Sequence, residues 1–419
     1  MIHKRCDVAV IGGGPAGLAA AMAAKREGAG SVMILERDSS LGGILQQCIH
    51  PGFGLTYFDE ELTGPEYAAR FSEEAAKEGV SFLLDTMVLH TEGTRLTCSN
   101  KRLGMMEVEA TSVVLAMGCR ERTRAQIQIP GSRPAGIYTA GTAQRLINRQ
   151  NVMVGHRVVI LGSGDIGMIM ARRLTLEGVE VVAVVEIMGY LSGLTRNRVQ
   201  CLDDFSIPLL LSHTVTRIVG KGRVEGVYIA KVDEQKAPIA ESERFIECDT
   251  LLLSVGLIPE NELTRSQGIE MDPVTGGPRL NQYQQTSLEG VFACGNVVHV
   301  NDLVDNVSSE SINAGIHAAR YSLKKTEAPQ GTVLCTPGRQ VRYISPQQIT
   351  LDQGREDVTL YFRATAPLKK VRITARIEGT VLLTKRAVRV NPGEMESLTI
   401  STKEFSDGQK LTIDIEEVR

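Results

Sequence analysis

Two glycine-rich motifs contain the residues whose types and spacing could do chemistry. The first, Gly12-x-Gly14-x-x-Gly17, follows the apolar run Val8–Ile11 and precedes an alanine-rich stretch. In a strand–turn–helix unit the first glycine permits a tight turn, the second lets a pyrophosphate approach the backbone, and the third lets the helix pack closely. Glu36 follows nineteen residues after Gly17 and is placed to accept hydrogen bonds from ribose hydroxyls. The motif therefore predicts a dinucleotide site.

The same pattern occurs a second time. Residues 156–187 align with residues 6–37 at a constant offset of 150, without a gap. Two complete copies, each with a glutamate at the same distance, disfavour an accidental match and predict two bound dinucleotides. The contacts expected from the two motifs are Gly12, Gly14, Pro15, Ala16, Gly17, Glu36 and Arg37 in the first, and Gly162, Gly164, Asp165, Ile166, Gly167 and Glu186 in the second.

Regular elements are expected around both motifs. The first motif should lead into a helix over residues 18–25 and a second strand over 32–35, and helices are also predicted over 65–78 and 308–323. For the last of these, Ser308 or Ser309 is the expected N-cap. Two apolar runs end in glycine, at Gly118 and Gly256, and should return the chain to the sheet beside each cofactor. The glycine-rich stretch 42–54 predicts a loop over the first cofactor.

Composition narrows the function classes. The chain has 419 residues, a net charge of −3 and eight cysteines, no two of which form a C-x-x-C pair. The net charge implies no broad basic face for nucleic acid. The spacing of the cysteines argues against a metal site, an iron–sulfur cluster of usual spacing or a redox dithiol. Scattered cysteines favour a reducing cytoplasm. The apolar stretch 8–24 contains three consecutive glycines followed by a proline, so we interpret it as a strand and a helix rather than a signal peptide, and we expect no membrane segment.

The character of the sequence changes after Pro329. Apolar and polar residues alternate over 358–362, 371–377 and 411–415, and turn signals occur at Pro392-Gly393 and Asp407-Gly408. This alternation therefore predicts a separate small β-sandwich over residues 331–419.

With Gly295-Asn296, the order of motifs resembles the pyridine nucleotide–disulfide oxidoreductase group of flavoproteins over residues 6–325. The resemblance implies an α/β fold with two Rossmann-like domains. The first domain (1–122 and 281–328) would bind FAD, and the second (123–280), inserted in it, would bind NAD(P)H. Where that group has Gly-Asp, this chain has Gly295-Asn296, which keeps hydrogen-bonding capacity without the charge. Further FAD contacts are expected at Gly42, Gly43, Val88, Gly118, Gly295 and Asn296, and an NAD contact at Gly256.

A closer resemblance concerns the segments 120–122, 130–131 and 135–144. They look like flavoprotein subunits of opine oxidases, hydrogen cyanide synthase and related amine dehydrogenases. The stretches 42–54 and 300–305 are similar to bacterial FAD-dependent oxidoreductases encoded beside glycerol-3-phosphate dehydrogenase-like flavoproteins and a small cysteine-rich protein. The resemblance implies a homo- or hetero-oligomeric electron-transferring subunit, whose partners are a dehydrogenase flavoprotein and a small iron–sulfur protein.

The disulfide reductases of this group carry a redox cysteine pair soon after Gly42-Gly43, and here only Cys48 follows, with His50 two residues later. Cys48 and His50 are the candidate catalytic residues, because an adjacent histidine could lower the pKa of the thiol. We favour the alternative that Cys48 is a small buried residue lining the flavin pocket.

Three functions remain open from the sequence. The first is electron transfer between NAD(H), FAD and a partner, with NADH favoured because the carboxylate of Glu186 repels a 2′-phosphate. The second is a free-standing NADH oxidase, peroxidase or disulfide reductase that uses Cys48. The third is a non-catalytic redox sensor or structural subunit with a degenerate nucleotide site.

Overall fold

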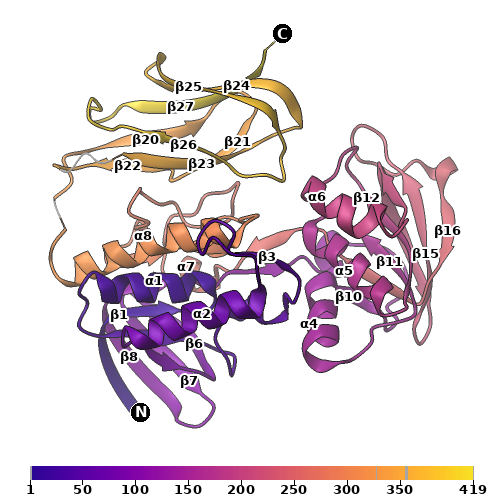
Figure 1. The fold of residues 1–419 in the computed structure, drawn as a ribbon, viewed down its shortest axis with the longest axis horizontal. Helices are drawn as coiled ribbons and strands as arrows, with labels where there is room; N and C mark the ends of the chain where they lie inside the picture. The colour runs from indigo at the N-terminus through magenta and orange to yellow at the C-terminus, as the bar shows by residue number, and fades with distance from the viewer. Residues whose placement is uncertain (1, 327, 354–356, 419) are drawn as a thin grey trace. The chain divides into compact units, whose positions relative to one another are not determined.

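The computed structural model describes residues 2–326, 328–353 and 357–418. They form two compact units, one made of Met1–Cys119 with Pro259–Arg419 and the other of Arg120–Ile258 (Figure 1). β9 (Cys119–Glu121) leads the chain into the second unit and β18 (Leu257–Pro259) leads it back. The predicted insertion of one dinucleotide-binding unit into the other is confirmed. Residues 259–280, which the sequence boundaries assign to the inserted domain, group with the first unit.

A seven-stranded sheet forms the centre of the first unit. β1 lies between β2 and β8, and these strands are parallel to one another and to β5 and β19. Val8 and Val10 of β1 are fully buried, which explains the continuous apolar run in the sequence, because a parallel sheet is covered on both faces. The strands are β1 (Ile2–Ile11), β2 (Val32–Leu35), β5 (Ser81–Leu83), β6 (Thr86–Glu92), β7 (Arg95–Asn100), β8 (Gly104–Leu115) and β19 (Val291–Ala293), and a separate pair is β3 (Pro51–Phe53) with β4 (Leu62–Thr63).

Helices rich in alanine pack against this sheet. α1 and α8 run side by side (Figure 1), and Ala20 and Ala24 of α1 and Ala314 and Ala318 of α8 are fully buried. Small side chains let the two helices approach the sheet and each other closely. The helices of this unit are α1 (Pro15–Arg26), α2 (Gly64–Lys77), α7 (Glu262–Ser266) and α8 (Val304–Ser322), with the short 3₁₀ helices η1 (Gly43–Gln47) and η4 (Gly295–Val297).

The second unit repeats the strand–turn–helix–strand arrangement. β11 lies between β17 and β12 in a parallel sheet of five strands, and a second sheet has the order β14-β15-β16. Its strands are β10 (Ile137–Thr139), β11 (Arg157–Leu161), β12 (Glu180–Glu186), β13 (Leu209–Leu211), β14 (His213–Gly220), β15 (Val224–Lys231), β16 (Arg244–Glu247) and β17 (Thr250–Leu253). Its helical segments are α3 (Arg124–Ile127), α4 (Ala140–Gln150), α5 (Asp165–Leu176), α6 (Thr195–Arg198), η2 (Val199–Asp203) and η3 (Ala240–Ser242).

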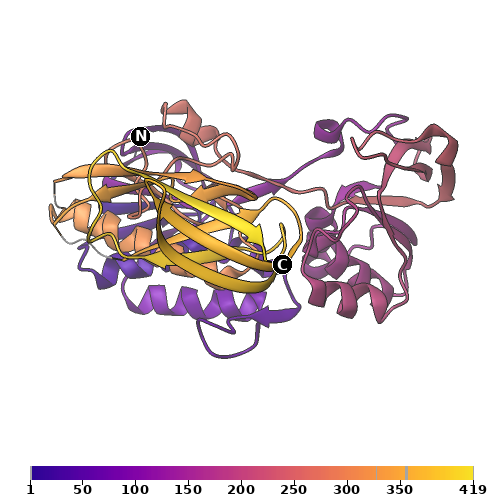
Figure 2. The ribbon, with the colours of Figure 1, turned by 90° about the horizontal axis from the view of Figure 1, so that it is seen from above.

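The C-terminal part of the first unit is the predicted β-sandwich, drawn in orange to yellow in Figures 1 and 2. One sheet has the order β22-β20-β27-β24-β25 and the other the order β21-β23-β26. Phe362, Ile373 and Ile413 are fully buried in its core. Its strands are β20 (Gly331–Pro337), β21 (Val341–Ser345), β22 (Gln348–Leu351), β23 (Val358–Ala364), β24 (Leu368–Ile377), β25 (Thr380–Val390), β26 (Glu396–Ile400) and β27 (Lys410–Glu417).

Two local predictions are wrong. The last helix of the first unit, α8, begins at Val304 and not at Ser308, and Leu303 is its N-cap. Ser308 is instead buried within the helix, where its hydroxyl lies 2.7 Å from the hydroxyl of Tyr67. The stretch 42–54 is also not wholly a loop, because η1 and β3 occupy part of it.

Candidate functional site

The first glycine turn has the geometry that a dinucleotide requires. Gly12 has φ +106°, and a Cβ there would lie 2.4 Å from the carbonyl oxygen of Ala116. A Cβ on Gly17 would lie 1.8 Å from the carbonyl oxygen of Gly12, so this glycine brings α1 against the turn. A Cβ on Gly14 would meet nothing within 4 Å. No side chain caps α1 at Gly14, so the helix presents its N-terminal N–H groups and partial positive charge to that open space. These residues fit the pyrophosphate of FAD.

The carboxylate of Glu36 completes this turn. It is 6% exposed and accepts hydrogen bonds from the backbone N–H of Gly13 at 2.6 Å and of Asp38 at 2.7 Å. These two hydrogen bonds therefore hold the residue that follows β2 against the glycine turn. In dinucleotide-binding units an acidic residue at this position binds the ribose of the adenosine half, so this contact of Glu36 stays a prediction.

Other predicted FAD contacts converge on the same turn. Gly43 approaches Gly14, because a Cβ on Gly43 would lie 3.1 Å from the Cα of Gly14. Gly42 donates its N–H to the carbonyl of Gly13 at 2.7 Å. A Cβ on Gly295 would lie 2.7 Å from the Cβ of Ala16, which places the start of η4 against α1. The structure thus brings together three segments that are far apart in the sequence.

The remaining predicted FAD contacts lie in several environments. Asn296 donates to the sulfur of Cys119, the residue after Gly118, at 3.6 Å. Arg37 is exposed. The side chain of Val88 is buried in the core of the sheet with Leu35. Contacts from Arg37 and Val88 to FAD therefore stay predictions.

The second turn reproduces the first in detail. Gly162 has φ +99°, and a Cβ there would lie 2.1 Å from the carbonyl oxygen of Ser254. Glu186 is 3% exposed and accepts from the backbone N–H of Ser163 at 2.8 Å and of Met188 at 2.8 Å. Ser163 and Met188 occupy the positions of Gly13 and Asp38, shifted by 150 residues. The sequence repeat is therefore also a repeat of hydrogen bonds.

The second turn differs from the first in what lies over it. Asp165, the first residue of α5, accepts hydrogen bonds from the N–H of Leu194 at 2.8 Å and from the side chain of Asn197 at 2.6 Å. Ser192 donates its hydroxyl to Glu186 at 2.9 Å and its N–H to the hydroxyl of Ser163 at 3.0 Å. The segment 192–197 is thus held against the turn, and a carboxylate stands at the helix end where a pyrophosphate would lie.

Three further predicted NAD residues have defined positions. A Cβ on Gly167 would lie 2.7 Å from the Cβ of Ser254, so α5 packs closely on the end of β17. Gly256 has φ +97° and accepts a hydrogen bond from the N–H of Arg122 at 3.0 Å. Ile166 packs against the core of the second unit. These residues frame the second turn as the sequence predicts, and their contacts to NAD stay predictions.

The environment of Cys48 disfavours the thiolate form. The residue as a whole is half-buried, but burial of the thiol raises its pKa to about 12. The sulfur donates to the carbonyl of Ile44 at 3.4 Å. The ring of His50 has its Nδ1 3.0 Å from the carbonyl oxygen of Pro51 and contacts Phe53, with the ring centroids 5.0 Å apart. A nucleophilic cysteine needs a lowered pKa, so this environment favours the interpretation of Cys48 as a packing residue.

We expect Cys48 to react slowly with iodoacetamide. At pH 8 a pKa of about 12 leaves the thiol protonated, so alkylation of the FAD-loaded protein should be at least about 100 times slower than that of free cysteine. Peptide mass spectrometry over time measures the rate at this residue, and the same protein in urea is the control, since unfolding should restore the ordinary rate. Alkylation of the folded protein at the rate of free cysteine would contradict this account of the thiol.

A buried polar network beside Asn296 was not predicted. His299 and Glu310 are almost fully buried and form an ion pair or hydrogen bond of 2.9 Å between Nε2 and Oε1. Asn301 donates its side chain to the other oxygen of Glu310 at 3.3 Å and its backbone N–H to Asn296 at 3.0 Å. No motif of the sequence indicates that His299 and Glu310, eleven residues apart, pair with each other. The network connects α8 to the predicted FAD contact Asn296.

The sandwich is joined to this segment by a buried ion pair. Arg363 of β23 lies 3.6 Å from Asp302, and both side chains are about one-tenth exposed. The same guanidinium donates to the carbonyls of Val300 and Pro392 at 3.0 Å each. Met395 donates its N–H to Asp302 at 3.2 Å. Charge and hydrogen bonds therefore anchor the segment that follows Asn296 to the sandwich.

Comparison with known proteins decides the family. The model of the pyridine nucleotide-disulphide oxidoreductases matches residues 6–319. The chain belongs to this family. It is accordingly an FAD-dependent oxidoreductase with a pyridine-nucleotide domain. Among the described residues, no helix has the length and hydropathy to span a bilayer.

Relatives of this family member include components of larger enzymes. The chain is 27% identical over 309 residues to the hydrogen cyanide synthase subunit HcnB of Pseudomonas aeruginosa, covering 70% of this chain and 66% of that one. It is 28% identical over 291 residues to one of the opine oxidase subunits of Agrobacterium tumefaciens, covering 63% and 55%. A solved thioredoxin reductase of T. acidophilum shares the fold, with a TM-score of 0.62 at 24% identity over 77% of this chain and 100% of that one. The chain thus spans less than two thirds of the length of these two enzyme components.

Proposed function

We propose that this chain is the electron-transferring subunit of a multi-component dehydrogenase, in which hydride passes between NAD(H) and FAD and electrons are exchanged with a partner flavoprotein or iron–sulfur protein. The observation that carries the proposal is the pair of glutamate-anchored glycine turns, one in each unit. The relatives named as subunits of larger enzymes support it. The buried Cys48 thiol supports it over a cysteine-based reductase.

The chain's own residues would bind and position the two nucleotides. FAD, when bound, supplies a group that accepts a hydride from NADH and releases electrons to a second acceptor. Gly14 and the start of α1 would hold its pyrophosphate, and Glu36 its ribose. Because positioning lowers the barrier to hydride transfer more than acid–base groups do, no catalytic acid or base is required of this chain.

The isolated chain should pass electrons to an artificial acceptor. With NADH and ferricyanide we expect turnover, and with NADH and dioxygen we expect far less, because the natural acceptor in this proposal is another protein. The Cys48→Ser variant should retain the ferricyanide activity within about twofold, since a packing residue contributes little to transfer. Turnover with dioxygen, peroxide or a disulfide that disappears in Cys48→Ser would support the cysteine-based enzyme instead.

We infer a preference for NADH over NADPH. In this proposal Glu186 is the residue that binds the ribose in the second turn, and a negative charge there would repel a 2′-phosphate. The specificity constant for NADH should exceed that for NADPH at least about tenfold, and Glu186→Gln should bring the ratio within about threefold, since it removes the repulsion. Glu180→Gln, on the same strand but half exposed, is the matched control and should not change the ratio. Equal use of both nucleotides by the unmodified chain would contradict this inference.

One observation favours a second candidate function, in which the chain is a redox sensor or structural subunit with a silent NAD site. Asp165 and the segment 192–197 stand at the end of α5 where a pyrophosphate would lie. Titration calorimetry of the FAD-loaded chain with NADH separates the two functions. Binding supports electron transfer, and no binding at millimolar NADH supports the sensor.

We propose that a partner subunit with an acidic surface docks on β25, the edge strand of the sandwich. Four apolar residues of this strand are exposed, and Val388 has 85% of its surface accessible. Residues 368–390, which form β24 and β25, contain seven lysines and arginines and one glutamate. Positively charged residues also protect edge strands from aggregation, but exposed apolar residues beside them favour an interface.

Sedimentation velocity tests whether the occupant of β25 is another protein or a second copy of this chain. A basic edge repels a second copy of itself, so we expect the isolated chain to be a monomer at low salt. A dimer that Val388→Asp dissociates would assign the edge to self-association instead. Val274→Asp, at another exposed valine, is the matched control.

The eight free cysteines are consistent with a location in the reducing cytoplasm, which we include in the proposal.

A further inference from the structure

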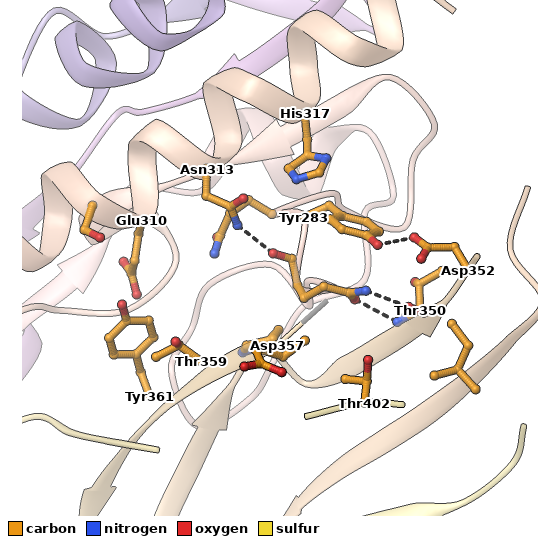
Figure 3. A pocket seen from close by; sticks show the side chains of 16 residues that line it. Tyr283, Glu310, Asn313, His317, Thr350, Asp352, Asp357, Thr359, Tyr361 and Thr402 are labelled. Atoms are coloured by element: carbon orange, nitrogen blue, oxygen red, sulfur yellow. Dashed lines mark hydrogen bonds between the residues drawn. The ribbon is translucent and has the colours of Figure 1, made fainter. Parts of the chain in front are cut away.

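A cavity of about 230 Å³ lies between α8, the segment 282–284 and the sandwich strands β22 and β23, all within the first unit (Figure 3). None of the predicted dinucleotide contacts lines it. Its volume is below the roughly 300–1,000 Å³ of sites for drug-sized ligands, so it suits a molecule of few non-hydrogen atoms. The cavity is therefore separate from both glycine turns and of a size to enclose a small ligand.

Hydrogen bonds between segments hold the walls of the cavity in place. The side chain of Gln282 donates to the carbonyl of Thr350 at 2.6 Å and accepts from its N–H at 2.8 Å. Asn313 of α8 donates to the carbonyl of Gln282 at 2.6 Å. The sandwich, the segment 282–284 and α8 are thus linked in one chain of bonds, drawn as dashed lines in Figure 3. A preformed cavity binds its ligand without the entropic cost of ordering the walls.

The charged groups among the described residues that line the cavity are all carboxylates. Glu310, Asp352 and Asp357 line it from different sides (Figure 3), and none of its described lining residues is lysine or arginine. Glu310 and Asp352 are less than one-tenth exposed. Asp352 accepts a hydrogen bond from the hydroxyl of Tyr283. A cavity with this lining attracts a cation and repels an anion.

Aromatic rings also line the cavity, beside its carboxylates. Tyr283 stacks on His317 with ring centroids 4.2 Å apart and an interplanar angle of 36°. Burial, and then the charge of Arg320, lower the pKa of His317 to about 4, so this ring is neutral at pH 7 and adds no positive charge. Tyr361 stands beside Glu310 on the opposite side (Figure 3). Aromatic faces beside carboxylates are a recognition surface for organic ammonium groups.

Metal ions do not fit this arrangement. No group of three or more histidine, cysteine, aspartate or glutamate side chains able to hold a metal exists in the part of the chain that the structure describes. The three carboxylates of the cavity therefore do not form a group of this kind. An organic cation can extend from one to another.

We propose that this cavity is a binding site for a small organic ammonium compound, held by the carboxylates of Glu310, Asp352 and Asp357 and by the rings of Tyr283 and Tyr361. The site goes beyond the proposed electron transfer and does not depend on it. Glu310 also accepts from Asn301, which in turn donates to Asn296 at the predicted FAD site. A cation beside Glu310 is thus two hydrogen bonds from Asn296, and its binding should change the flavin absorption spectrum.

Titration calorimetry of the FAD-loaded full-length protein tests the proposal, with 1,4-diaminobutane and tetramethylammonium as cations and 1,4-butanediol as the uncharged control. At least one cation should bind with 1:1 stoichiometry, and the diol should bind at least about tenfold more weakly than the diamine, because it lacks the charge. If neither cation binds at concentrations up to about 10 mM, or the diol binds as well as the diamine, the proposal is overturned.

Charge-neutralising variants locate the binding. Asp352→Asn should weaken the binding cation about tenfold or more while it keeps an acceptor for Tyr283. Glu234→Gln, an exposed carboxylate of the second unit, makes the same change in net charge and should have no effect. Asp357→Asn is the second cavity variant. If Asp352→Asn does not fold, the affinity of Asp357→Asn for the cation is measured instead. Unchanged affinity in a folded cavity variant would overturn the assignment, whereas NADH-dependent flavin reduction should be unaffected in either variant.

Discussion

Replacement of Gly14 by alanine is expected to abolish tight FAD binding while the chain still folds. Gly14 has φ −74°, which alanine adopts without strain, and an added Cβ would meet no atom of the chain within 4 Å. The open space is where the pyrophosphate approaches the backbone, so the methyl group should displace it and weaken FAD binding about 100-fold or more. Flavin content after gel filtration and the affinity of the apoprotein for added FAD measure the loss.

Gly17→Ala and Gly164→Ala are the controls for this result. A Cβ on Gly17 would lie 1.8 Å from the carbonyl oxygen of Gly12, so Gly17→Ala should destabilise the fold itself by about 3 kcal/mol or more. Gly164→Ala makes the same change in the second unit and should leave the flavin content unchanged. Full flavin content in Gly14→Ala would show that the first turn is not the FAD site.

Replacement of Arg363 by methionine is expected to destabilise the first unit strongly. The change leaves Asp302 buried without its charged partner and removes the donors to the carbonyls of Val300 and Pro392. Breaking a buried pair by removing one partner costs about 3–5 kcal/mol, much of it from the uncompensated charge. Denaturant unfolding followed by circular dichroism measures the free energy of unfolding.

Arg372→Met provides the matched comparison in the same sandwich. Arg372 is about half exposed and lies 3.4 Å from Glu416, and exposed ion pairs contribute only about 0–1 kcal/mol. We expect its unfolding free energy to stay within about 0.5 kcal/mol of that of the unmodified chain. If Arg363→Met costs no more than Arg372→Met, the ion pair does not anchor the segment after Asn296.

Local sequence patterns were sufficient to predict both glycine turns and the sandwich. Each glycine of the first turn meets a steric requirement within one strand–turn–helix unit, at Gly12, Gly14 and Gly17. Glu36 lies at a distance from them that is set by the length of α1. The alternation of apolar residues in β23, β24 and β27 likewise follows from one covered face of each sheet. These features need no knowledge of distant contacts.

Features that depend on distant contacts could not be predicted in this way. Ser308 has the chemistry of an N-cap, but its hydroxyl contacts Tyr67, more than 200 residues earlier, and the helix continues through it to Val304. Asp302 finds its partner Arg363 only because the sandwich packs on the segment after Asn296.

The carboxylate cavity is a second case of this kind. It forms where residues 282–284 meet residues about 70 positions later in the chain. No local pattern encodes such a pairing.

An anaerobic titration of the purified flavoprotein with NADH tests hydride transfer between the two bound nucleotides. We expect a flavin absorption spectrum that bleaches rapidly and fully with one equivalent of NADH, without a long-wavelength charge-transfer band from Cys48. A flavin that keeps its oxidised spectrum in excess NADH would contradict hydride transfer between two bound nucleotides, and electrons would then have to enter from the partner.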